Sequence, residues 1–156
     1  MMKKFVILIL ITLNLTNCGY APIYSEKNVT NFEIKNLKIE GNNVVNSIIQ
    51  NKLQKYFNND SEKKYVISIK TDYEKIIATK DLTGKATNLK LVVNLSLNYT
   101  KLGLENNEQQ RVINFSESQI IKRDQNNYEQ GNYENILIRN MSELLINKVI
   151  LQLARS

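Results

Sequence analysis

The sequence contains no histidine and only one cysteine among its 156 residues. Without histidine the chain cannot build a Ser-His-Asp or Cys-His catalytic arrangement, nor a histidine-based zinc site. A single cysteine can form neither an internal disulfide nor a thiolate metal site. The glycine-rich phosphate loops GxxxxGK[ST] and GxGxxG are absent as well. These absences argue against most enzyme classes, and we expect no catalytic activity, no metal and no dissociable cofactor.

The sequence also lacks an apolar run long enough to span a bilayer as a helix. Its most apolar stretch, FVILILITLNL at residues 5–15, has a basic start before it, with Lys3 and Lys4, and a short polar exit after it. This arrangement is typical of a secretory signal. An ordinary buried strand or helix is the alternative, but such segments rarely follow a Lys-Lys pair. We therefore expect residues 1–17 to be a signal peptide.

The only cysteine lies directly after this run, in Leu15-Thr16-Asn17-Cys18-Gly19. The segment resembles the bacterial lipobox, which has Leu, two mostly small residues and then Cys; Asn17 departs from the usual Gly, Ala or Ser. The resemblance implies that Cys18 becomes the first residue of a mature lipoprotein and carries a diacylglycerol thioether and an N-linked acyl chain such as palmitate. Several acyl chains hold a protein stably on a membrane. A free buried thiol is the alternative interpretation.

Length and composition predict one domain behind this anchor. The chain is 42% apolar, which is sufficient for one modest core. We expect residues 18–31 to be an acylated tether and residues 32–156 to be a single folded domain.

Alternation of apolar and polar residues predicts the strands of this domain. Residues 64–73, KYVISIKTDY, and residues 88–99, NLKLVVNLSLNY, place an apolar or aromatic residue at nearly every second position. Thr83, Gly84 and Lys85 mark the turn between them. Further strands are expected at residues 32–39 and 110–121, the latter with Ile113 and Phe115 directed inward. Such a sheet has one apolar and one polar face.

Helical periodicity predicts two helices. Residues 43–57 repeat apolar side chains at helical spacing, with Asn43 as the expected cap. Residues 131–154 are apolar on more than one side, so this helix is expected to pack on the sheet and the first helix, or to turn part of its surface to a partner. The resulting fold class is α+β, a two-layer sandwich of about four mainly antiparallel strands with two helices on one face, in the order β-α-β-β-β-α.

The segment from the cysteine onward, Cys18-Gly19-Tyr20-Ala21-Pro22-Ile23-Tyr24, resembles the start of the lipopolysaccharide-assembly lipoprotein (LptE) family. The element order and the final apolar helix agree with that family. The resemblance implies a non-enzymatic plug and assembly subunit inside the outer-membrane β-barrel LptD, which delivers lipopolysaccharide to the cell surface. It also implies an outer-membrane address on the periplasmic side, and the residue after the cysteine is not the Asp that favours inner-membrane retention.

The resemblance also implies direct lipopolysaccharide binding. Basic residues near the turn between the second and third expected strands are the candidates: Lys75, Lys80, Lys85 and Lys90. Ammonium groups bind phosphates through charge-assisted hydrogen bonds, although lysines are more often simply solvated. In this compartment the anions are lipid head groups and lipopolysaccharide phosphates, and we expect no nucleic acid partner.

Two other interpretations stay open. The chain could be an independent envelope lipoprotein that binds lipid or a cell-envelope polymer without a barrel partner. It could also be an enzyme with a pair of catalytic carboxylates, of the kind found in glycosidases. The candidates for that pair are Asp72, Asp81, Glu105, Glu108 and Glu117, although nothing in their spacing favours such a site.

The lipoprotein hypothesis makes one direct prediction. Replacing Cys18 by Ser removes the sulfur that would form the thioether, so the variant should incorporate no labelled fatty acid in cells. The unsubstituted chain, labelled in parallel, is the control. Persistent acyl labelling of the Cys18→Ser variant would refute the hypothesis.

Overall fold

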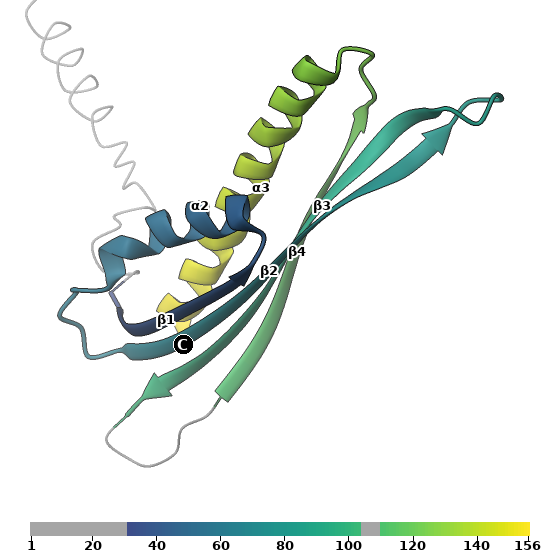
Figure 1. Ribbon diagram of the computed structural model, residues 1–156. Coiled ribbons are helices and arrows are strands. Elements are labelled where there is room, and N and C mark those ends of the chain that lie inside the picture. The colour runs from purple at the N-terminus through teal and green to yellow at the C-terminus, as the bar shows by residue number, and fades with distance from the viewer. Residues whose placement is uncertain (1–30, 104–109) are drawn as a thin grey trace, which may run out of the picture.

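The computed structural model describes residues 31–103 and 110–156, which form a sheet with two helices on one side (Figure 1). The elements in chain order are β1 (Glu33–Gly41), α2 (Asn43–Leu53) with a 3-10 turn η2 (Gln54–Tyr56), β2 (Lys64–Lys80), β3 (Ala86–Leu102), β4 (Gln110–Lys122) and α3 (Asn127–Arg155). This is the expected β-α-β-β-β-α order. The strands lie in the order β1-β2-β3-β4, with β1 parallel to β2 and the other two pairings antiparallel.

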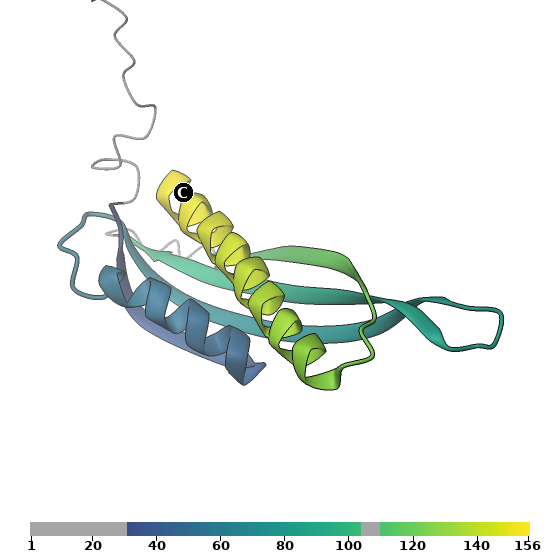
Figure 2. The ribbon, with the colours of Figure 1, turned by 90° about the horizontal axis from the view of Figure 1, so that it is seen from above.

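The two faces of the sheet follow the alternation in the sequence. The odd-numbered residues of β3 from Leu89 to Tyr99 are all buried beneath the helices. The odd-numbered residues of β2 from Tyr65 to Thr71 are buried on the same side, and Ile113 and Phe115 of β4 pack against this core. The even-numbered residues face away from the helices. Figure 1 shows both helices on one side of the sheet, and in Figure 2, seen from above, α3 crosses in front of the strands. The predicted dry and wet faces are therefore confirmed.

The connection from β1 to β2 is tight because the two strands are parallel and α2 must cross between them. Gly41 ends β1 with a φ of 115°, and a Cβ there would lie 1.9 Å from the backbone oxygen of Thr71. The Thr71 hydroxyl accepts the N–H of Asn42 at 3.0 Å and donates to the Asn46 side chain at 2.6 Å. Asn42, and not the expected Asn43, caps α2 by accepting the N–H groups of Val44 and Val45.

α3 is longer than expected and is fixed at its C-terminus by side chains from the sheet. The Tyr65 hydroxyl donates to the carbonyl of Leu153 at 3.0 Å, and the Lys63 ammonium donates to that of Ala154 at 2.8 Å. Lys101 donates to the carbonyl of Ser156 at 2.7 Å. Helix C-termini carry unpaired carbonyls and a partial negative charge, so these donors stabilise that end.

α3 packs on the sheet and on α2, as expected, but one of its two apolar sides is only partly covered. Leu137 and Met141 are buried, whereas Tyr133, Leu144 and Leu151 of the same expected side are between 42% and 54% exposed. Ile136 is 56% exposed as well. An exposed apolar stripe therefore runs along the outer surface of α3.

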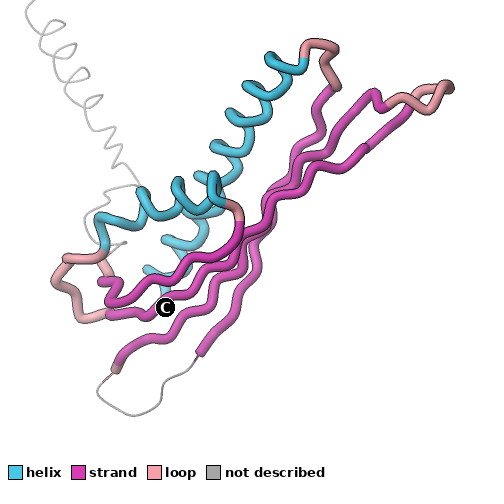
Figure 3. The backbone as a smooth tube through the Cα atoms, viewed as in Figure 1, coloured by secondary structure: helices cyan, strands magenta, loops and turns pink. Residues whose placement is uncertain are grey.

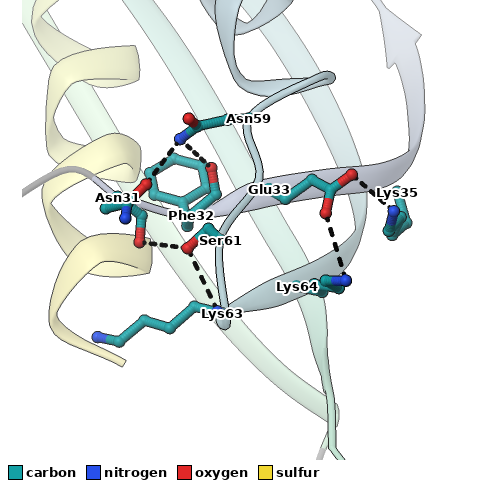
Figure 4. Close-up of polar contacts among 8 residues, drawn as sticks. All are labelled: Asn31, Phe32, Glu33, Lys35, Asn59, Ser61, Lys63 and Lys64. Atoms are coloured by element: carbon teal, nitrogen blue, oxygen red, sulfur yellow. Dashed lines mark hydrogen bonds and ion pairs between the residues drawn. The ribbon is translucent and has the colours of Figure 1, made fainter.

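The described chain begins at a cluster of polar contacts beside the start of β1 (Figure 4). The Asn59 amide donates to the Asn31 side chain at 3.0 Å and to the Phe32 carbonyl at 3.1 Å, and Ser61 donates to the Asn31 carbonyl at 3.0 Å. The mostly buried Glu33 carboxylate pairs with Lys35 at 2.6 Å and Lys64 at 3.8 Å. The first residues of β1 are thus held at both backbone and side chain.

The crossover geometry predicts different costs for two glycine substitutions. Gly41→Ala should lower the free energy of unfolding by about 3 kcal/mol, because a left-handed φ and a collision with backbone add together. Gly84→Ala is the matched control: its φ is 82°, but its Cβ would meet nothing within 4 Å, so about 1 kcal/mol is expected. Urea unfolding followed by circular dichroism measures both. Equal losses for the two variants would contradict the crossover argument.

Candidate functional site

The uncovered face of the sheet is the face opposite the helices, and no described secondary structure lies over it. Even-numbered residues of β2, β3 and β4 lie in register there, so that Lys70, Ser96 and Asn114 form one row and Asp72, Asn94 and Ser116 form the next. These six residues line a shallow depression of about 350 Å³. Short neutral side chains dominate this face, and Ser116 donates to Asn94 at 2.7 Å across the β3–β4 pair.

The β2–β3 hairpin is the second distinctive feature, because it projects beyond the helices and the other strands (Figure 3). Register shifts at Ile77/Thr79 and Thr79/Lys80 interrupt its regular pairing near the tip. At the turn, the Asp81 carboxylate accepts from the Thr83 N–H and hydroxyl and from the Lys85 N–H, all within 3.0 Å. The hydrogen bond from the Thr83 hydroxyl, followed by that from Lys85, lowers the pKa of Asp81. The tip is therefore an ordered turn.

The four candidate lysines do not form one cluster. Lys80 and Lys85 lie on either side of the turn and are exposed at the tip. Lys75 faces the helices and binds the Glu134 carboxylate of α3 at 2.9 Å. Lys90 lies on the opposite, uncovered face of the same hairpin. The alternation of the strands separates Lys75 from Lys90, so the hairpin tip presents a pair of lysines rather than four.

Exposed apolar residues accompany these lysines, and sequence reasoning missed them. Leu82, at the tip between Lys80 and Lys85, is fully exposed. Ile76 and Ile120 are paired with Lys90 from either side and are 45% and 63% exposed. A signal was available in IIATKDLTGK at residues 76–85, where apolar residues persist after the alternation has ended.

Lys75 belongs to a polar cluster that fixes α3 to β2. Its partner Glu134 is mostly buried and also accepts from the Gln130 amide at 2.8 Å, while Gln130 accepts the backbone N–H of Asp124 at 2.6 Å. The nearby Tyr73 hydroxyl is the one buried side-chain polar atom of the described residues without a hydrogen-bond partner. Burial, with a further contribution from the Glu134 charge, raises the pKa of Tyr73.

The candidate catalytic carboxylates that lie among the described residues are not close to one another. Asp72 lies on the uncovered face, Asp81 is held in the hairpin turn, and Glu117 faces the helices and pairs with Lys148. Glu105 and Glu108 lie outside the described residues. Within residues 31–103 and 110–156, no group of three or more His, Cys, Asp or Glu side chains is placed to hold a metal ion.

The expected signal peptide at residues 1–17 and the expected acylation site at Cys18 also lie outside the described residues, as does the tether up to residue 30. No helix among the described residues has the length and apolar character needed to cross a membrane.

Comparison with known proteins adds structural neighbours but no sequence relatives. No protein-family model matches the chain, and no curated protein sequence matches it. Rare lipoprotein B from Shewanella oneidensis superimposes with a TM-score of 0.55 at 10% identity, over 75% of this chain and 91% of that chain. The uncharacterized lipoprotein B from Nitrosomonas europaea gives 0.58 at 16% identity, over 82% and 87% of the two chains.

A minor lipoprotein from Acinetobacter baumannii gives a TM-score of 0.54 at 11% identity, over 81% of this chain and 92% of that chain. At these identities the similarity is one of fold. The chain therefore shares the fold of these three lipoprotein structures, over 87% to 92% of their lengths.

Proposed function

We propose that this chain is a lipoprotein anchored in the outer membrane through Cys18, and that it acts as the plug and assembly subunit of an LptD-type β-barrel in lipopolysaccharide transport. The observation that carries the proposal is the combination of two independent features. The described domain has the fold of solved structures that are named lipoproteins, and the sequence ahead of it has a lipobox-like cysteine. The two features lie in separate parts of the chain.

The uncovered sheet face supports the plug role. The interior of a large outer-membrane barrel is polar and lined by alternate strand residues. A domain that fills it needs a folded exterior of polar side chains that exchange hydrogen bonds with that lining. The Ser and Asn side chains of these rows on β3 and β4 supply such groups, and Lys70 and Asp72 at the β2 end of the rows add one charge of each sign.

The projecting hairpin supports a contact with lipopolysaccharide. Its tip combines two exposed lysines with the fully exposed Leu82, and Lys90 lies between two exposed isoleucines. A lipid that carries both phosphates and acyl chains is matched by this pairing of ammonium and apolar groups. Lys75 contributes less than the other three lysines, because Glu134 already neutralises it.

The hairpin proposal is tested by charge reversal. Replacing Lys80 and Lys85 together by Glu should weaken binding of purified lipopolysaccharide by on the order of tenfold, because two phosphate partners become repulsive groups. The matched control is Lys52→Glu with Lys55→Glu, which makes the same change in net charge on α2 and η2, away from the hairpin (Figure 1). A pull-down with immobilised lipopolysaccharide measures both. Equal binding by the two double variants removes the hairpin from the proposal.

The barrel proposal is tested by co-purification. Native membranes are extracted in mild detergent, the chain is isolated, and its stoichiometric partner is identified by mass spectrometry. We expect a large β-barrel at a one-to-one ratio, lost on denaturation. An acylated chain recovered from the outer membrane without a barrel would overturn the plug role and favour an independent envelope-binding lipoprotein.

A further inference from the structure

The two edges of the sheet are protected to different degrees. Edge strands expose unpaired backbone groups, and proteins usually protect them with bulges, prolines or charged side chains. β1 is nine residues long, has a register shift between Ile34 and Asn36, and carries charged side chains at Lys35, Lys38 and Glu40. β4 is thirteen residues long and also carries charged side chains, at Arg111, Glu117 and Lys122, but it pairs with β3 without a register shift and contains no proline or glycine. No described residue pairs with its outer edge.

Regular pairing determines which residues of β4 present their backbone N–H and C=O groups at the free edge of the sheet. The Arg123 N–H donates to the Thr87 carbonyl at 2.9 Å, which makes these two residues a hydrogen-bonded pair. In an antiparallel ladder such pairs alternate along the strand. The odd-numbered residues of β4 therefore bond to β3, and the even-numbered residues from Gln110 to Lys122 present their N–H and C=O groups at the free edge. The side chains of the same even-numbered residues lie on the uncovered face.

The even-numbered side chains are arranged symmetrically about Ser116. Val112 and Ile120 are 61% and 63% exposed, and each lies four residues from Ser116. Antiparallel pairing of two β4 strands about Ser116 would place Val112 of each copy opposite Ile120 of the other, and Asn114 opposite Ser118. Cross-strand apolar pairs of this kind stabilise sheets. Each copy would thereby cover the apolar residues that its partner exposes.

The odd-numbered side chains tolerate the same register. Glu117 would lie opposite Phe115, Ile113 opposite Gln119, and Arg111 opposite Ile121 of the second copy. No two like charges face each other, and such pairs would have opposed the association. A register shifted by one residue in either strand would lose both the backbone match and the match between faces.

The same two-fold arrangement determines where the helices of both copies lie. A two-fold axis through Ser116, perpendicular to the sheet, keeps the helices of both copies on the same side. Lys148 of α3 reaches Glu117 of β4, so this flank of α3 faces the junction. Leu144 and Leu151 lie one turn to either side of Lys148 on the helix, and both are exposed. They belong to the apolar stripe that the single copy leaves uncovered.

We propose that two copies of this chain associate through β4, antiparallel and centred on Ser116, to form one continuous eight-stranded sheet. A second copy fits the free edge of β4 because its backbone direction, its apolar side chains and its charges all match in one register. The dimer is proposed for the chain outside a barrel, because the plug role proposed above uses one copy per barrel, and it does not depend on acylation.

A cysteine scan of the full chain in mild detergent tests the register. In a hydrogen-bonded antiparallel pair the Cα atoms lie about 5.5 Å apart, within the range that a disulfide spans. Ser116→Cys should therefore yield a reducible dimer when copper phenanthroline accepts the two electrons. Asn114→Cys and Ser118→Cys should each yield little, because like residues would lie about 13 Å apart, but the double variant should cross-link. The unsubstituted chain, oxidised in parallel, gives the contribution of Cys18.

Charge variants in the Ser116→Cys background provide a second readout. V112K/I120K would place a lysine of one copy opposite a lysine of the other at two positions. Because like charges repel, the dimer yield should fall on the order of tenfold. V112D/I120K would oppose aspartate to lysine and should keep the yield. Circular dichroism of each variant checks that it is folded. Three results would overturn the proposal: no dimer with Ser116→Cys, equal yields from all three single cysteines, or a cross-link to a different protein.

Discussion

The unbroken alternation of β3 is the constraint on which the rest of the structure depends. Six consecutive odd-numbered residues from Leu89 to Tyr99 must leave water together, and only a sheet face covered by helices allows this. β3 pairs along most of its length with β2 on one side and β4 on the other. The single core, the uncovered polar face and the position of both helices all follow from that central strand. A shift of one residue in its register would expose the entire apolar set.

Polar contacts fix the position of the helices along the sheet, which the apolar core does not determine. The core defines which face the helices cover but not how far along the sheet they lie. Tyr65, Lys63 and Lys101 fix the C-terminal end of α3, and Lys75 with Glu134 fixes its N-terminal part. Thr71 performs the same task for the start of α2. Most of these anchoring residues lie on β2, so this strand sets the register between the two layers.

Much of the fold was predictable because the spacing of apolar side chains differs between strands and helices. The faces of β2 and β3, the two helices and the order of elements follow from spacing alone. The pattern ended at Tyr73, although β2 continues to Lys80, because the projecting part of the hairpin has no core to cover and needs no alternation. The parallel pairing of β1 with β2 was not predictable, since alternation looks the same in parallel and antiparallel strands.

The candidate site was predictable only in part, because side-chain periodicity does not show which face or which neighbour a residue meets. Lys75 and Lys90 are close in the hairpin but project from opposite faces, and the sequence interval alone did not reveal this. The exposed residues Ile76, Leu82 and Ile120 gave no periodic signal because nothing packs on them. Conversely, an apolar side of α3 read from the sequence could not distinguish buried Leu137 from exposed Leu144. Burial depends on the neighbouring layer, which a single helix does not encode.

The parallel pairing of β1 also determines how the domain responds to mechanical load. The chain enters the sheet at the start of β1, beside the start of β2, and the contacts of Asn31 and Glu33 hold that entry point. Tension applied there along the strand axis pulls β1 lengthwise past β2. Every hydrogen bond of the ladder then shares the load in shear, whereas tension across the ladder would open the bonds one at a time. A pull on the preceding chain along the axis of β1 would therefore be resisted by all the hydrogen bonds of the β1–β2 ladder together.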